Sequence, residues 1–177
     1  MYSVQIIDYG SKLWGRGTGR EVRESILASF LKSSESTLVL DFSGVDILDF
    51  SFASEVIGVI ISRLAQELYG KHVILTQMNK FVEENIGVAL ERPELCALIM
   101  DNNKWRLLGK CSDKLIETLK LIIELKEVDT PTLAHHLKIN IPACNNRLKT
   151  LNLLGLIDRE EISAPSGGKQ FLYRSII

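Results

Sequence analysis

The fold of the first half of the chain is decided by one stretch, Leu38–Glu55, which reads LVLDFSGVDILDFSFASE. Its beginning, Leu38–Phe42, is a nearly continuous apolar run, which is typical of a buried strand in an α/β sheet. Gly44 interrupts the run, and a second apolar segment leads to Ser51 at the start of a helical pattern. The stretch therefore predicts a strand, a serine-bearing turn and a helix. The serine can either cap that helix or be modified by a partner.

The composition is that of an ordinary globular protein. Of 177 residues, 46% are hydrophobic and 24% are charged, enough to bury a core in one or two small domains. The three cysteines are widely spaced and form no CxxC pair, so we expect a reducing cytoplasm and neither a disulfide framework nor a zinc site. No secretory signal or bilayer-length apolar run is found in the sequence, so no membrane association is expected.

Strand and helix patterns alternate over residues 1–109. Further strands are predicted at Val4–Asp8, His72–Thr76 and around Ala97–Met100, and helices over Arg20–Lys32, Phe52–Leu68 and Lys80–Leu90. This alternation predicts an α/β domain with a parallel or mixed sheet and helices packed on it. A linker is predicted near Asn102–Ser112, which is polar and lacks clear periodicity. Two domains are therefore expected, at residues 1–109 and 110–177.

The second domain has three helix-start signals followed by two strand patterns. The helices are expected to begin at Ser112, at Thr130 with Pro131 as the first helical residue, and at Asn140, and the strands to cover Leu156–Ile162 and Gln170–Ile176, joined by residues 164–168. Three helices and a β-hairpin are the elements of a helix-turn-helix with an added wing.

The line from Thr130 to Tyr173 resembles the winged-helix DNA-binding domains of bacterial transcription regulators. The matching segments are TPTLAHHL, NNRLKTLNLLGLIDR and GGKQFLY, and RLKTLNLLGLI is the most specific. The resemblance implies that the third helix enters the major groove of double-stranded DNA, with Cys144, Leu148 and Leu151 facing the core. Winged-helix regulators are often dimers, so a homodimer is expected by analogy alone.

Two sets of side chains are expected to contact DNA, because asparagine can bond adenine and lysine can reach phosphate. Ala143, Asn145, Asn146 and Lys149 are expected on the outer face of the third helix, and Arg147, Thr150, Arg159 and Lys169 at the DNA backbone. Residues 110–177 hold only 10 Lys/Arg against 8 Asp/Glu, and Glu160 and Glu161 lie on the wing. An alternative in which this domain binds proteins therefore stays open.

No catalytic or metal-binding set of residues is found in the sequence. His135 and His136 are adjacent on a predicted helix, so their side chains point about 100° apart and do not form a metal site. No Ser-His-Asp, Cys-His or paired-carboxylate arrangement is recognised, so we expect no enzyme activity and no cofactor. Cys144 is expected to be a small buried residue, with a redox role as the alternative.

The segment DFSGVDILDFSFASEVIGVI resembles the central motif of STAS domains, which sulfate transporters and anti-sigma factor antagonists share. Aligned on Asp49, Ser51 falls on the serine that a histidine-kinase-like ATPase phosphorylates in the antagonists. Phe50 and Phe52 replace the first serine and the glycine of that motif, so the chain looks more like a divergent STAS-like group of bacterial regulators. The resemblance implies a regulatory protein partner, and it leaves Ser51 either a phospho-acceptor or a helix cap.

The run Gly10–Gly19, GSKLWGRGTG, precedes a predicted helix and carries Arg16. Such a run can hold phosphate, but it lacks the P-loop ending and the GxGxxG spacing, so a turn or partner-contacting loop is favoured. The whole sequence predicts a cytoplasmic transcription regulator with a STAS-like input domain and a DNA-binding winged helix. Two alternatives remain, namely an adaptor whose two domains bind only proteins and a sensor of nucleotides or other small ligands.

Overall fold

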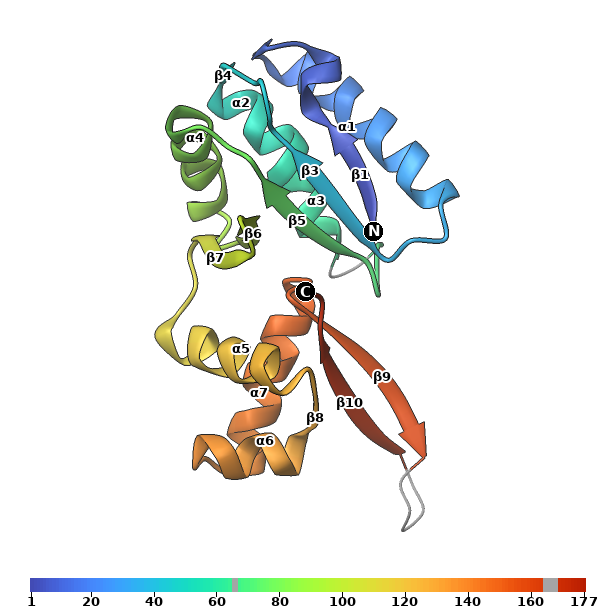
Figure 1. Ribbon diagram of the computed structural model, residues 1–177, viewed down its shortest axis with the longest axis vertical. Helices are drawn as coiled ribbons and strands as arrows, with labels where there is room; N and C mark the ends of the chain where they lie inside the picture. The colour runs from blue at the N-terminus through green and yellow to red at the C-terminus, as the bar shows by residue number, and fades with distance from the viewer. Residues whose placement is uncertain (65–66, 164–168) are drawn as a thin grey trace. The chain divides into compact units, whose positions relative to one another are not determined.

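The computed structural model describes residues 1–64, 67–163 and 169–177 (Figure 1). Over these residues the chain forms two compact units, Met1–Cys111 and Ser112–Ile177, each of which is described by itself. The predicted boundary, after residue 109, lies close to this division. In the part of the chain that the structure describes, no helix combines the length and the apolar character needed to cross a bilayer.

A five-stranded sheet with the strand order β1-β3-β5-β6-β7 forms the base of the first unit. Its strands are β1 (Tyr2–Gln5), β3 (Thr37–Asp41), β5 (His72–Thr76), β6 (Cys96–Asp101) and β7 (Lys104–Gly109). β1, β3, β5 and β6 run parallel to one another, and β7 runs antiparallel to β6. The mixed α/β architecture predicted for this part of the chain is thus confirmed, and the apolar run from Leu38 forms β3, between β1 and β5.

The helices of the first unit pack on the sheet and share one hydrophobic core with it (Figure 1). They are η1 (Ile6–Tyr9), α1 (Arg16–Lys32), α2 (Phe50–Ala53), the π-helical segment η2 (Ser54–Gly58), α3 (Val59–Leu64) and α4 (Lys80–Glu91). The segments α2, η2 and α3 follow one another without a break, and η2 contacts both α1 and α4. Two short strands, β2 (Lys12–Leu13) and β4 (Ile47–Leu48), pair in parallel beside the start of α2.

The segment predicted as a linker near Asn102–Ser112 is largely strand β7, so that prediction was wrong. The turn between β6 and β7 consists of Asn102 and Asn103, whose φ angles are 48° and 60°. Two-residue β-hairpin turns often have positive φ at both residues, as these two asparagines do. Asparagine tolerates this left-handed conformation better than most residues. The polar turn and the short strand therefore resembled a linker in the sequence.

Several predicted element boundaries also shift. The strand predicted at Val4–Asp8 ends at Gln5 and continues as η1, and α1 begins at Arg16 instead of Arg20. The helix predicted from Phe52 begins at Phe50, and its predicted end includes residues 65–66, which lie outside the described residues.

The second unit contains three helices followed by two long strands, in the predicted order. Its elements are α5 (Asp113–Leu125), β8 (Glu127–Asp129), α6 (Thr130–Leu137), α7 (Ile141–Leu153), β9 (Ile157–Ser163) and β10 (Lys169–Ser175). The short strand β8 was not predicted, and it adds to the hairpin to give an antiparallel sheet with the order β8-β10-β9. The predicted turn over residues 164–168 lies outside the described residues.

Side-chain caps fix where α6 and α7 begin. Asn140 caps α7 as predicted, because its side-chain oxygen accepts a hydrogen bond from the Ala143 amide at 2.8 Å. The cap of α6 is Asp129 and not Thr130, since the Asp129 carboxylate accepts from the Thr132 amide at 2.9 Å. Thr130 is therefore the first helical residue, one place before Pro131.

Two glycines of the first unit have different roles although both lie in α1. A Cβ atom on Gly19 would lie 3.0 Å from the Glu55 Cβ and 3.3 Å from the Phe52 Cα, so the helices approach closely only because this position is glycine. Gly17 is exposed, and a Cβ atom there would meet nothing within 4 Å. Gly19 is therefore needed for packing, whereas Gly17 is not.

We predict that Gly19→Ala destabilises the first unit by roughly 1–3 kcal/mol, as overpacking of a tight contact does. The control Gly17→Ala should stabilise it by about 0.4–1 kcal/mol, because alanine restricts the unfolded chain more than glycine does. Urea unfolding monitored by tryptophan fluorescence checks both, since both tryptophans, Trp14 and Trp105, lie in the first unit. Equal effects of the two substitutions would contradict the packing role of Gly19.

Candidate functional site

The outer face of α7 is set by the residues that it buries. Cys144, Leu148 and Leu151 are fully buried, as predicted, and their spacing of four and three residues places them on one side of the helix. Asn145, Asn146 and Lys149 lie on the other side and are exposed. The helix therefore presents two amides and a cation away from the core of the second unit.

This face of α7 and the β9–β10 hairpin together line a hollow of about 340 Å³, which we call the α7–hairpin hollow. Its lining residues are Asn145, Asn146, Lys149, Asn152, Arg159, Phe171 and Tyr173. Four of them were predicted as DNA contacts, namely Asn145, Asn146, Lys149 and Arg159. The other three were missed, although Asn152 follows Lys149 at helical spacing and Phe171 alternates with Tyr173 along a strand.

Arg159 is held over the hollow by aromatic side chains of the neighbouring strand. Its guanidinium carbon lies 4.5 Å from the ring centre of Phe171, and its partner across the strands is Tyr173. Stacking on an aromatic face orients a guanidinium group. Burial raises the pKa of the Tyr173 phenol, so this ring is uncharged at neutral pH. Among the described residues, the hollow is therefore lined by two cationic side chains and by no acidic one.

The remaining predicted DNA contacts lie elsewhere. Arg147 is turned toward α5, where its guanidinium donates to the Glu117 carboxylate and the Thr118 hydroxyl, each at 3.1 Å. Its side chain is only 16% exposed, so the predicted contact with the DNA backbone is not supported for Arg147. The Thr150 hydroxyl is exposed but bonds to the Asn146 carbonyl at 3.0 Å.

Two further predicted contacts lie at the ends of elements. Ala143 is half-buried in the first turn of α7, where its amide donates to the cap residue Asn140. Lys169 is the first residue of β10, and its side chain lies outside the described part of the chain. Ala143 is not among the residues that line the α7–hairpin hollow.

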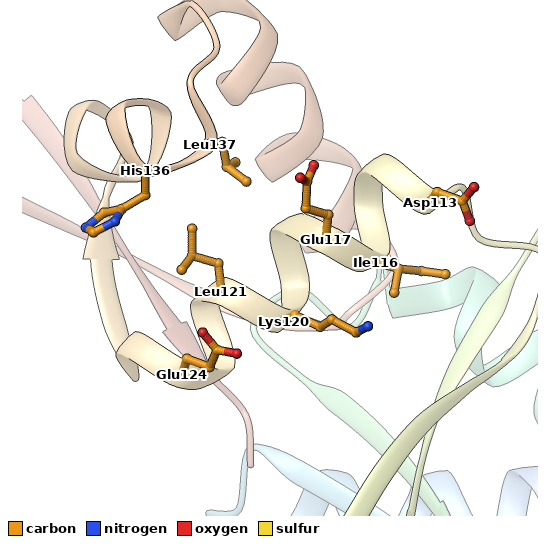
Figure 2. Close-up of a pocket in the computed structure, with 8 residues that line it drawn as sticks. All are labelled: Asp113, Ile116, Glu117, Lys120, Leu121, Glu124, His136 and Leu137. Carbon is orange, nitrogen blue, oxygen red and sulfur yellow. The ribbon is translucent and has the colours of Figure 1, made fainter.

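A second hollow, of about 440 Å³, lies between α5 and α6 (Figure 2). Its lining residues are Asp113, Ile116, Glu117, Lys120, Leu121, Glu124, His136 and Leu137. In Figure 2 the carboxylates of Glu117 and Glu124 project from α5 on either side of Leu121. Even with Glu117 paired to Arg147, the other two carboxylates outnumber the one lysine, so this surface repels phosphate, in contrast to the α7–hairpin hollow.

Asp49, and not Ser51, caps the helix within the STAS-like motif. The Asp49 carboxylate accepts from the Phe52 amide at 2.7 Å, so Phe50 is the first helical residue and Ser51 the second. The interpretation of Ser51 as the cap was therefore wrong, because an acidic residue two positions earlier makes the capping bond. A phosphate on Ser51 would lie near this carboxylate and repel it. The alternative of a phospho-acceptor stays a prediction.

The glycine-rich run does not form one continuous loop. It contains β2 and the first four residues of α1, and its turn residues Gly10 and Gly15 have φ angles of 127° and 84°. The Gly15 amide faces both oxygens of the Asp49 carboxylate, each at 3.2 Å. A phosphate that used this amide would have to displace a carboxylate, which argues against a nucleotide site here.

We predict that Asp49→Ala lowers the stability of the first unit by about 1–2 kcal/mol, the usual effect of losing a helix cap. Ser51→Ala is the matched control and should change stability by less than about 0.5 kcal/mol, as most substitutions away from such features do. Urea unfolding followed by tryptophan fluorescence measures both. A loss on Ser51→Ala as large as that on Asp49→Ala would contradict the observed cap.

Comparison with known proteins supports the STAS resemblance over part of the chain. Residues 18–88 match the family model described as a STAS-like domain of unknown function (DUF4325). The solved structure of a "possible transcriptional regulator" from Methanosarcina mazei Go1 is 17% identical, with a TM-score of 0.36 over 46% of this chain and 75% of that chain. That score is too low to support a conclusion about this chain. No curated protein matches it. Residues 18–88 are thus similar to a STAS-like domain whose function is unknown.

Proposed function

We propose that the protein is a transcription regulator whose second unit is a winged-helix domain that binds double-stranded DNA. In this proposal α7 is the recognition helix and the β9–β10 hairpin is the wing. The first unit is a STAS-like domain that receives its signal through protein contacts and carries out no catalytic step. The order of the elements and the burial of Cys144, Leu148 and Leu151 support the assignment of α7.

The observation that carries the proposal is the composition of the α7–hairpin hollow. Lys149 and Arg159 come from different elements and line the same hollow, and none of its lining residues is acidic. DNA binding depends on cations that meet phosphates, so a surface of this kind is favourable and an acidic one is not. The α5–α6 hollow, with three carboxylates, is the opposite case.

The amides on α7 supply the groups needed to read bases. Asn145 and Asn146 are exposed, and an asparagine side chain can bond N6 and N7 of adenine at once. Lys149 lies one turn after Asn145 and is suited to a phosphate beside the groove. The stacked guanidinium of Arg159 is suited to a second phosphate, reached from the hairpin.

The proposed role of the first unit is supported by apolar side chains exposed around Asp49. Trp14 follows β2 and is 58% exposed, whereas Ile47 in β4 and Phe50 in α2 are 37% and 38% exposed. Exposed aromatic and aliphatic groups at one place are typical of protein-binding surfaces. The same feature favours the second candidate function, an adaptor that binds only proteins.

We predict that Lys149→Ala weakens binding of any DNA duplex and lowers the dependence of log K on log[salt] by about 0.9, the value for one lost phosphate contact. Lys120→Ala, in the acidic α5–α6 hollow, is the matched control and should leave affinity unchanged. Fluorescence anisotropy at two salt concentrations, with a duplex from the promoter of the protein's own gene and a shuffled duplex, measures both effects.

Two outcomes of this measurement separate the candidate functions. Tighter binding of the promoter duplex than of the shuffled one, with a steep salt dependence, supports a sequence-specific regulator. Absence of binding to either duplex, together with co-purification of a histidine-kinase-like ATPase, would refute DNA binding and favour the adaptor.

We also predict that Glu161→Gln strengthens DNA binding. Glu161 is the cross-strand partner of Phe171, the residue on whose ring Arg159 is stacked. The negative charge of Glu161 would therefore repel a phosphate that binds to Arg159. The gain should be about threefold, or ~0.6 kcal/mol, as for one exposed charge pair. Weaker binding of Glu161→Gln in the same anisotropy assay would contradict this placement of the DNA.

A further inference from the structure

Two cysteines that are far apart in the sequence meet at the end of the β6–β7 hairpin. Cys96 is the first residue of β6 and is buried, and its partner across the two strands is Gly109. Cys111 follows Gly109 by two residues and is half-buried. Cys111 therefore lies within two residues of the position that faces Cys96, and each thiol shifts the pKa of the other. The hairpin thus turns two separate cysteines into a pair.

The backbone around Gly109 holds the two cysteines together. Gly109 has a φ angle of 99°, and a Cβ atom there would lie 2.4 Å from the Leu95 carbonyl oxygen and 3.2 Å from the Cys96 Cα. Only glycine allows the chain to pass this close to the start of β6. The next amide, of Lys110, then donates to the Leu95 carbonyl at 3.0 Å, so the chain that leads to Cys111 stays against the start of β6.

The two thiols are not equivalent. The hydrogen bond from Cys96 lowers the pKa of the Cys111 thiol, although burial partly opposes this shift. The same hydrogen bond, together with burial, raises the pKa of the Cys96 thiol. Cys111 is also the more accessible of the two. Because the thiolate is the reactive form, Cys111 has the properties of an attacking thiol and Cys96 those of a resolving thiol.

We propose that Cys111 and Cys96 form a dithiol site that reacts with hydrogen peroxide and closes to an intrachain disulfide. The Cys111 thiolate attacks one peroxide oxygen, the O–O bond breaks, and the released hydroxide takes up a proton to become water. The Cys111 sulfenic acid is then attacked by the Cys96 sulfur. The S–O bond breaks, the S–S bond forms, and the leaving hydroxide takes the Cys96 proton to give a second water. Overall, two thiols are oxidised to a disulfide and one peroxide is reduced to two waters.

The third cysteine provides an internal control. Cys144 is fully buried under α7 in the other unit, and burial raises the pKa of its thiol. It therefore lacks both the accessibility and the thiolate character that oxidation requires. The Cys144 thiol donates a weak hydrogen bond to the Thr130 carbonyl oxygen at 3.8 Å.

Oxidation would act at the point where the first unit ends. Cys111 is the last residue of that unit, and Ser112, the residue before α5, follows it directly. A disulfide would fasten this end of the chain to the start of β6. The site is independent of the proposed DNA binding, because none of its groups belongs to the second unit.

The experiment uses the full-length reduced protein. It is treated with a small excess of hydrogen peroxide, the remaining thiols are blocked with N-ethylmaleimide, and intact mass and peptide mapping are recorded. We expect the loss of two hydrogens, a single blocked thiol at Cys144, and a peptide that joins Cys96 to Cys111. Cys144→Ser should form the same crosslink, and Cys111→Ser should form none and keep Cys96 as a thiol.

A second variant tests the order of the two steps. In Cys96→Ala the Cys111 sulfenic acid has no resolving thiol within the chain, so dimedone should trap it, with circular dichroism as the check on folding. The proposal is overturned if both Cys96 and Cys111 of the folded wild-type protein remain thiols at peroxide excess. It is also overturned if the disulfide joins two chains, or if Cys144 is oxidised first.

Discussion

The packing of the first unit depends on the carboxylate of Asp49, which accepts hydrogen bonds from backbone amides at the beginnings of two helices. It caps α2 through the Phe52 amide and also accepts from the amide of Gly15, which precedes α1. Both helix N-termini carry amides that lack partners within their helix and have a positive dipole end, so one anion stabilises them together. Because Phe52 is then turned into the core, the cap also fixes how the helical layer packs on the sheet.

The contact that Asp49 begins is continued along the two helices. One turn after Gly15, Gly19 allows the backbone of α1 to approach Phe52 and Glu55. One turn further, the Arg23 guanidinium donates to the Glu55 carboxylate at 2.8 Å and to its carbonyl at 3.1 Å, with both side chains nearly buried. A buried ion pair adds little net stability but is costly to break, so it favours one packing of the helices over others. Glu55 lies in the π-helical segment, and both its carboxylate and its carbonyl oxygen accept from Arg23.

How much the sequence could predict depended on whether a signal was local. The apolar run from Leu38 and the cap Asn140 are local, and both were predicted correctly. The prediction of Ser51 as the helix cap failed because two residues of the same motif can cap the helix. The sequence alone does not decide between Asp49 and Ser51. The α7–hairpin hollow was only half predicted, because Phe171 and Tyr173 reach it from a strand that pairs with β9 across the hairpin. The pairing of Cys96 with Cys111 likewise requires the hairpin, which the sequence had presented as a linker.

The weak positive balance of the second unit conceals a separation of charge. The acidic side chains of α5 gather at the α5–α6 hollow, whereas Lys149 and Arg159 meet at the α7–hairpin hollow. Arg147 lines neither hollow, because it leaves the outer face of α7 and pairs with Glu117. At an ionic strength of about 0.1 M, charges more than about 10 Å apart are largely screened from each other. A DNA phosphate therefore responds to the charges near it and not to the net charge of the domain. The net charge of residues 110–177 is therefore no argument against DNA binding, provided that the DNA approaches from the side of α7.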